Sequence, residues 1–215
     1  MTLLCYIPLK HRLASCLPLT TLALLAAWPL LRFGPPGEID GANHFYRFVE
    51  LDWHLRHGEW YPRWFSDVHF GFGAPILNFY APLSYYILVC LRSIIPSFST
   101  AFLLGFALSI VVAITGMYAW AKHQFSSAQA GLTAAAAYGF TPYFYITALG
   151  RGSLSEAWGL AFAPWLFWAV LRGVQRPSRS TRLTLTVLYA VLLLTHSLST
   201  LLFTPLLVTY GIIAA

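Results

Sequence analysis

Carboxylates are concentrated in one short segment of this 215-residue chain. Six of its seven acidic residues fall between positions 38 and 67, and the seventh is Glu156; the six are Glu38, Asp40, Glu50, Asp52, Glu59 and Asp67. Asp40, His44 and Arg47 are spaced i, i+4, i+7, which places them on one face if the segment is helical. Such a stripe can bind a polar substrate, with Asp as a base or metal ligand and Arg for phosphate. The alternative is a capping Asp beside a surface ion pair, worth only about a few tenths of a kcal/mol.

Three further groups of residues offer chemistry, and each has a structural alternative. Arg151 and Glu156 flank small residues, where they could hold a phosphate and a metal, or form an ion pair that closes a turn. His196 follows an apolar segment, and is either a pocket residue or a hydrogen-bonded helix terminus. His54 and His57 could ligate a metal from adjacent helical turns. Two solvated histidines are the alternative for that pair.

The composition requires a lipid environment for much of the surface. Residues are 58% hydrophobic and only 9% charged, whereas a soluble domain has roughly a quarter of its residues charged. Aromatic residues make up 17% of the chain, which suits a protein that crosses two membrane interfaces. The formal charge of +6 comes from basic residues that flank apolar runs, as topology signals do, and not from a patch of the kind that binds nucleic acid.

The order of apolar segments predicts an all-α, polytopic transmembrane helix bundle that forms a single membrane module over residues 1–215. A spanning helix needs about 20 mostly apolar residues. The candidates are 13–31, 97–121, 128–149, 153–171, 183–195 and 198–213. The chain ends at Ala215 inside an apolar run, so we expect it to be the N-terminal part of a longer protein.

Basic residues set the expected orientation. Lys10-His11-Arg12 precedes the first span, and Arg172–Arg182 is the densest basic loop, so both should be cytoplasmic. The N-terminus is then cytoplasmic, and the loop 32–74 lies outside, as do residues 149–156. Only 97–121 can return the chain to the inner side, so the segment 75–96 is predicted to be re-entrant or interfacial.

The outer loop should contain one helix of its own. A helix from Gly41 to His57 would be capped by Asp40 and would stop at Gly58. Apolar residues would line much of its remaining surface, which suits a helix lying on the membrane surface. These apolar residues are Phe45, Phe48, Val49 and Leu55.

Several motifs, in this order, resemble a known family. They are Asp40-x3-His44-x2-Arg47, Gly58-Glu59-Trp60-Tyr61-Pro62-Arg63-Trp64, Gly71-Phe72-Gly73-Ala74-Pro75, Phe79-Tyr80-Ala81-Pro82-Leu83, Tyr85-Tyr86, Pro142-Tyr143 and Arg151-Gly152-Ser153-Leu154-Ser155-Glu156. The order resembles bacterial 6-pyruvoyl-tetrahydropterin-synthase-related multi-pass membrane proteins, which are similar to the YfhO-like group and the GT-C glycosyltransferase superfamily. The resemblance extends from Leu13 to His196. Soluble pterin synthases resemble zinc enzymes with a histidine triad on a β-rich fold, and this sequence supplies neither feature.

The GT-C resemblance implies a membrane enzyme of the bacterial inner membrane, with interfacial helices in the first outer loop. Such enzymes pass a sugar from a polyprenyl-phosphate donor to a cell-envelope acceptor at the outer face. Asp40 matches their acidic position after the first span, where it would act as the base or hold a divalent cation together with Glu156. The substrate- and phosphate-binding candidates are His44, Arg47, Arg63, Arg151, Glu156 and His196. Many GT-C members have two adjacent acids in this loop, whereas Gly41 follows Asp40 here.

Two other functions fit a membrane protein of this kind. A lipid-linked-glycan transporter would place polar groups near the middle of its spans. A non-catalytic assembly protein would use the outer loop to bind a partner. The predicted spans are nearly free of charge, which favours a pocket at the membrane surface. The composition makes membrane lipid an expected partner and nucleic acid an unexpected one, and the GT-C resemblance implies a polyprenyl-phosphate sugar donor.

Overall fold

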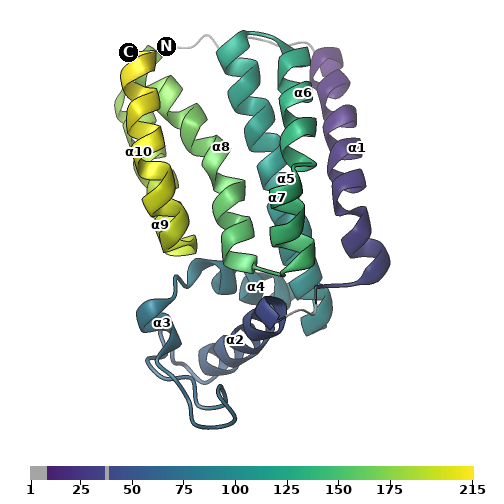
Figure 1. Ribbon diagram of the computed structural model, residues 1–215, viewed down its shortest axis with the longest axis vertical. Coiled ribbons are helices and arrows are strands. Elements are labelled where there is room, and N and C mark those ends of the chain that lie inside the picture. The colour runs from purple at the N-terminus through teal and green to yellow at the C-terminus, as the bar shows by residue number, and fades with distance from the viewer. Residues whose placement is uncertain (1–8, 37–38) are drawn as a thin grey trace.

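The computed structural model describes residues 9–36 and 39–215, which form a helix bundle with a smaller group of elements at one end (Figure 1). The long helices α1, α5, α6, α8, α9 and α10 run side by side, and α2, α3 and α4 lie below them in the view. The bounds are α1 Leu9–Phe33, α2 Ile39–Arg56, α3 Ile76–Phe79, α4 Leu83–Ile94, α5 Phe98–Phe125, α6 Ala128–Gly139, α7 Pro142–Tyr145, η1 Ile146–Gly150, α8 Leu154–Gln175, α9 Arg179–Thr195 and α10 Ser197–Ala214. No strand occurs within the described ranges.

Three helices are long and apolar enough to cross a membrane: α5, α8 and α10. Two shorter apolar helices are Leu17–Phe33, within α1, and α4. The all-α fold class is thereby confirmed for the described residues. Membrane crossing by the other predicted spans stays a prediction.

The bundle is built around α5 and α8. Helix α5 packs against α1, α4, α6 and α8, and α8 also packs against α9 and α10. On α5, Phe102, Phe106, Ile110 and Ile114 are spaced four residues apart and are fully buried. This stripe holds the central helices at fixed positions, and so fixes where the loops emerge at each end.

Serine residues begin several of these helices. The side chains of Ser97 and Ser127 accept hydrogen bonds from backbone N–H groups one turn ahead, and Ser178 forms a capping box with Thr181. Such side chains satisfy N–H groups that lack a partner inside the helix. The capping box starts α9 four residues before the predicted span 183–195.

The predicted span 128–149 is not one continuous helix. Helix α6 ends at Gly139, Pro142 starts the short helix α7, and residues 146–150 form a π-helical turn. Proline has no N–H to donate and its ring disfavours helix in the preceding residue, so a new helix begins there. The sequence prediction was wrong here because apolar composition alone does not reveal the break.

The segment 75–96 contains α3 and α4, with Pro82 immediately before α4. Helix α4 packs against both α2 and α5, at the end of the bundle that carries α2 (Figure 1). How this segment sits relative to the bilayer stays a prediction.

Helix α2 differs from its prediction in two respects. It begins at Ile39, so Asp40 lies in the first turn rather than at the cap, and it ends at Arg56 before Gly58, whose φ is +86°. Its apolar face packs on protein: the ring of Phe48 lies 5.4 Å from that of Phe98, and Phe45 lies 5.4 Å from Phe102. The first turns of α5 thus cover the side that we expected to face lipid.

Candidate functional site

A cavity of about 230 Å³, which we call the polar pocket, lies where α2 meets the ends of α8 and α10. It is lined by Asp40, Asn43, His44, Arg47, Tyr80, Arg151, Ser153, Glu156, His196 and Leu198. Six of the seven predicted site residues are in this set. The ten lining residues come from four separate segments of the chain, which only the folded bundle brings together.

Two glycines allow the start of α2 to lie close to the loop after η1. Gly152 has a φ of +68°, and a Cβ added to it would lie 2.8 Å from the Cα of Gly41. A Cβ on Gly41 would lie 2.3 Å from the carbonyl oxygen of Pro36. The absence of both side chains therefore lets the start of α2 approach the loop after η1, and this approach places Asp40 next to Arg151.

Arg151 joins the two carboxylates of the pocket. Its Nη2 donates to Oδ2 of Asp40 at 3.1 Å, and its Nη1 donates to Oε2 of Glu156 at 3.2 Å. The hydroxyl of Tyr143 donates to the other oxygen of Glu156. The hydrogen bond to Asp40, together with the charge of Glu156, raises the pKa of Arg151. The single positive charge of Arg151 is thus shared between the two carboxylates, and its two hydrogen bonds fix the orientation of both.

Arg47 has a different environment. Its guanidinium lies 4.6 Å from the centre of the Tyr80 ring, and its Nη1 donates to the Tyr85 hydroxyl at 3.3 Å. Among the described residues it forms no ion pair with a carboxylate. A cation held by aromatic groups without a counter-ion is free to bind an anion.

His44 is buried and neutral. Its Nδ1 lies 2.8 Å from the Tyr85 hydroxyl, which accepts from Arg47 and can donate its proton to the ring. Burial, reinforced by the charges of Arg47, His196 and Arg151, lowers the pKa of His44 from 6.5 to about 3. The imidazole therefore acts in the pocket as an uncharged hydrogen-bonding group.

His196 fulfils both of the roles that the sequence left open. Its Nδ1 accepts a hydrogen bond from the backbone N–H of Ser199 at 3.2 Å, which caps the start of α10. The proton of the neutral ring is then on Nε2, on a side chain that also lines the polar pocket. Burial lowers its pKa, so capping and pocket lining use the same neutral tautomer.

The described residues contain no cluster of three or more His, Cys, Asp or Glu that could hold a metal. At the predicted pair Asp40 and Glu156, the guanidinium of Arg151 lies between the carboxylates. This geometry supplies one positive charge where a divalent cation would otherwise sit.

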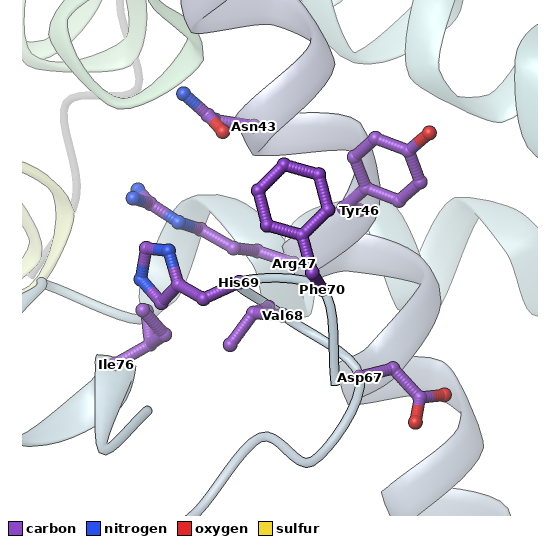
Figure 2. A pocket seen from close by; sticks show the side chains of 8 residues that line it. All are labelled: Asn43, Tyr46, Arg47, Asp67, Val68, His69, Phe70 and Ile76. Carbon is purple, nitrogen blue, oxygen red and sulfur yellow. The ribbon is translucent and has the colours of Figure 1, made fainter. Parts of the chain in front are cut away.

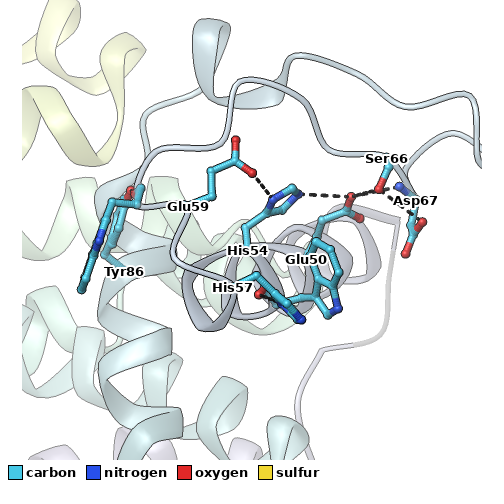
Figure 3. A network of polar contacts seen from close by, with 9 residues as sticks. Glu50, His54, His57, Glu59, Ser66, Asp67 and Tyr86 are labelled. Carbon is cyan, nitrogen blue, oxygen red and sulfur yellow. Dashed lines mark hydrogen bonds and ion pairs between the residues drawn. The ribbon is translucent and has the colours of Figure 1, made fainter.

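The predicted histidine pair has separate local partners. His54 is buried, not solvated, and lies between Glu59 at 2.6 Å and Glu50 at 4.0 Å (Figure 3). His57 uses Nδ1 to bind the carbonyl of Trp53. His54 therefore holds the loop after α2 through Glu59, whereas His57 bonds back to α2, and the two imidazoles do not form a shared site.

Arg63 is the predicted site residue that the structure places elsewhere. It is exposed, donates to the Asn78 side chain at 3.3 Å and lies near the Tyr61 ring. Conversely, sequence reasoning missed the roles of Tyr80 and Tyr85 around Arg47. Both belong to the motif Phe79–Tyr86, whose closely spaced tyrosines were the available signal.

A second cavity, which we call the apolar pocket, adjoins the polar pocket. It measures about 180 Å³ and shares Tyr80, His196 and Leu198 with it. Its other lining residues are Phe79, Ala81 and Ser197. Phe79 is 83% exposed and Leu198 is 58% exposed, so this pocket opens between α3 and the first turn of an apolar, membrane-length helix.

Comparison with known proteins relates the chain to a family of membrane proteins and to a bacterial protein. The family described as "6-pyruvoyl-tetrahydropterin synthase related domain; membrane protein" matches residues 77–215, more than half of the chain. This range includes Tyr80, Arg151, Glu156 and His196 but not the pocket residues of α2. No solved structure matches.

The relative is a protein of Lactococcus lactis subsp. cremoris (strain MG1363) described as an uncharacterized protein. It is 25% identical over 193 residues, which cover 88% of this chain. The aligned region is 31% of the relative, so this chain spans about a third of that protein's length.

Proposed function

Because this chain belongs to the 6-pyruvoyl-tetrahydropterin synthase related family of membrane proteins, we propose that its polar pocket transfers a sugar from a polyprenyl-phosphate donor to a cell-envelope acceptor. The observation that carries the proposal is the gathering of Asp40, Arg47, Arg151, Glu156 and His196 around one cavity. The likeness of the motifs to GT-C glycosyltransferases supports the same reaction class.

The reaction assigns a separate task to Asp40, Arg151 and Arg47. The acceptor hydroxyl oxygen forms a bond to the anomeric carbon of the sugar, and the bond from that carbon to the phosphate oxygen breaks. Asp40 takes the hydroxyl proton as general base, while Arg151 holds its carboxylate in place. The electron pair leaves with the lipid phosphate, whose charge Arg47 stabilises.

The donor needs a route for its lipid chain. The apolar pocket adjoins the polar pocket at Tyr80 and His196, and it opens beside α10, one of the helices that can cross a membrane. A polyprenyl chain in the bilayer could thus remain in lipid while its phosphate enters the polar pocket. This supports a membrane-bound donor over a soluble sugar nucleotide.

The test is Asp40→Asn in the full-length protein. Membranes would receive a panel of radiolabelled undecaprenyl-phosphate sugars, with cell envelopes as acceptors. Loss of the base should reduce transfer by roughly 10²–10⁴-fold, with unchanged expression and thermal stability. Glu59→Gln is the matched control, because Glu59 lies on the same outer loop and outside the pocket.

Two results would contradict the proposal. Full transfer by Asp40→Asn would remove this carboxylate as the base. Movement of a lipid-linked sugar across vesicles without transfer to any acceptor would instead identify a transporter.

A further inference from the structure

A third cavity, which we call the loop pocket, lies between α2 and the loop 67–76, and measures about 380 Å³ (Figure 2). It is lined by Asn43, Tyr46, Arg47, Asp67, Val68, His69, Phe70 and Ile76. Asn43 and Arg47, one turn apart on α2, line the polar pocket as well. The two cavities therefore share a wall, and the loop pocket lies on the side of α2 that faces the long outer loop.

The backbone over this cavity is strained. His69 and Phe70 have φ values of +54° and +60°, in the left-handed region that bulky side chains rarely adopt. Non-glycine residues persist in such conformations when surrounding contacts fix them, and they cluster at ligand sites. The Phe70 ring is fully exposed and lines the cavity, and Figure 2 shows it in front of α2 in that view, with Arg47 and Tyr46 on either side.

The contacts that fix this loop lie on either side of the strained residues. The backbone N–H of Asp67 donates to the buried carboxylate of Glu50 at 2.9 Å (Figure 3). The Gly73 N–H donates to the Val68 carbonyl, and Phe65 and Ala74 exchange two backbone hydrogen bonds. The fold thus fixes the backbone on both sides of Phe70, whose side chain is fully exposed.

The lining matches one kind of ligand. A carboxylate, an amide and an imidazole can bind hydroxyl groups, and two exposed aromatic rings can cover the apolar C–H face of a pyranose. A lipid chain would leave these polar groups unpaired, at a cost in free energy. A free phosphate would use Arg47 but would gain nothing from the two rings.

We propose that the loop pocket binds a sugar ring of the acceptor glycan. This inference rests on the proposed function, since it takes the polar pocket as the place of transfer. The donor route lies on the α10 side, and the loop pocket lies across Arg47 from it. An acceptor bound there would present a hydroxyl to Asp40 from the water side.

The test measures sugar binding separately from transfer. The full-length protein in detergent would be examined by saturation-transfer NMR with free maltose, cellobiose and N,N′-diacetylchitobiose as probes. Binding of at least one probe is expected, and Phe70→Ala should weaken it by roughly tenfold, as loss of an aromatic contact does. Phe72→Ala is the matched control, because Phe72 is 85% exposed on the same loop and does not line the pocket.

A second variant excludes loss of folding as the cause. Phe70→Gly accepts the left-handed conformation without strain, so its thermal midpoint should not fall although sugar binding does. The inference is overturned if none of the probes binds, if Phe70→Ala binds as well as the parent, or if undecaprenyl phosphate displaces the sugar. Asp40→Asn should keep sugar binding while losing transfer, so failure of the acceptor site and failure of the transferase proposal give different results.

Discussion

At the level of single residues, two arginines supply the positive charge of the polar pocket in different ways. Arg151 donates to Asp40 and Glu156, so its charge is already balanced. Arg47 contacts the Tyr80 ring and the Tyr85 hydroxyl, and neither group neutralises it. Arg47 is therefore the residue that can receive the charge of a donor phosphate, whereas Arg151 positions the base.

Arg47→Gln should weaken binding of undecaprenyl phosphate by roughly 10–100-fold, because a charge-assisted hydrogen bond contributes about 1.5–3 kcal/mol. Native mass spectrometry of the purified protein with titrated lipid would measure this. Arg63→Gln is the matched control, since Arg63 is exposed in the loop that follows α2 and lies outside the pocket. Equal losses in the two variants would show that only the total charge of the loop matters.

The buried His44 makes stability depend on pH. Its pKa is about 3 in the folded protein and 6.5 in the unfolded chain, so the unfolded chain binds more protons between these values. Stability is then complete above about pH 6.5 and falls as pH decreases, by about 2 kcal/mol at pH 5. His44→Gln should lose less thermal stability between pH 7 and pH 5 than the parent protein.

The thermal midpoint in detergent at each pH measures this effect. His57→Gln serves as control, because His57 is exposed directly after α2, the helix that carries His44. If the parent and His44→Gln lose stability in parallel as pH falls, another group causes the acid sensitivity.

Spacing along a helix predicted part of the site, and long-range packing decided the rest. Asp40, His44 and Arg47 follow a helical repeat, so their common face could be read from the sequence. The segment around Arg63 is also charged and aromatic, but it has no helical repeat. The sequence therefore could not predict the direction of the Arg63 side chain. Tyr85 reaches His44 from 41 residues away, a contact that depends on how α4 packs against α2.

At the level of elements, the π-helical turn and the glycines around it position Arg151. The Arg151 N–H donates to the carbonyl of Ile146 at 2.7 Å, five residues back. π-Helical turns are often found at functional sites because they redirect the chain locally. Together with the positive φ of Gly152, this turn brings the loop against the first turn of α2.

Gly152→Ala should reduce transfer and destabilise the protein by about 1–3 kcal/mol, because it places a Cβ against Gly41 and requires a strained φ. Gly150→Ala is the control, since the nearest side-chain atom would be 3.8 Å away. Thermal midpoints and transfer rates of both variants would be compared. A Gly152→Ala protein with parental activity would mean that the contact between α2 and this loop is dispensable.

Helix boundaries were predictable where local chemistry sets them. Serine before an apolar run marks the starts of α5 and α6, whereas the polar first turn of α9 after Ser178 hid its start from a search for apolar segments. Local composition could not predict the face on which α2 packs, because Phe45 and Phe48 suit either lipid or the aromatic residues of α5. Only the position of Phe98 and Phe102 after folding settles that choice.

At the level of the whole molecule, the acidic residues gather at one end of the bundle. The described acidic residues all lie at the end that carries α2 and the polar pocket (Figure 1). Five basic residues flank the helix ends on the opposite side: Lys122, Arg172, Arg176, Arg179 and Arg182. Since basic residues are retained on the cytoplasmic side, we propose that the polar pocket faces outward.

Cysteine labelling in intact cells tests this orientation, starting from a protein whose native cysteines are replaced by serine. Phe72→Cys lies on the outer loop and should react with a membrane-impermeant maleimide, whereas Gln175→Cys, at the opposite end of α8, should react only after lysis. Ser93→Cys, near the end of α4, should react in intact cells, as Phe72→Cys does, if segment 75–96 does not cross the membrane. Labelling of Gln175→Cys alone would place the pocket in the cytoplasm, where an acceptor in the outer envelope could not reach Asp40.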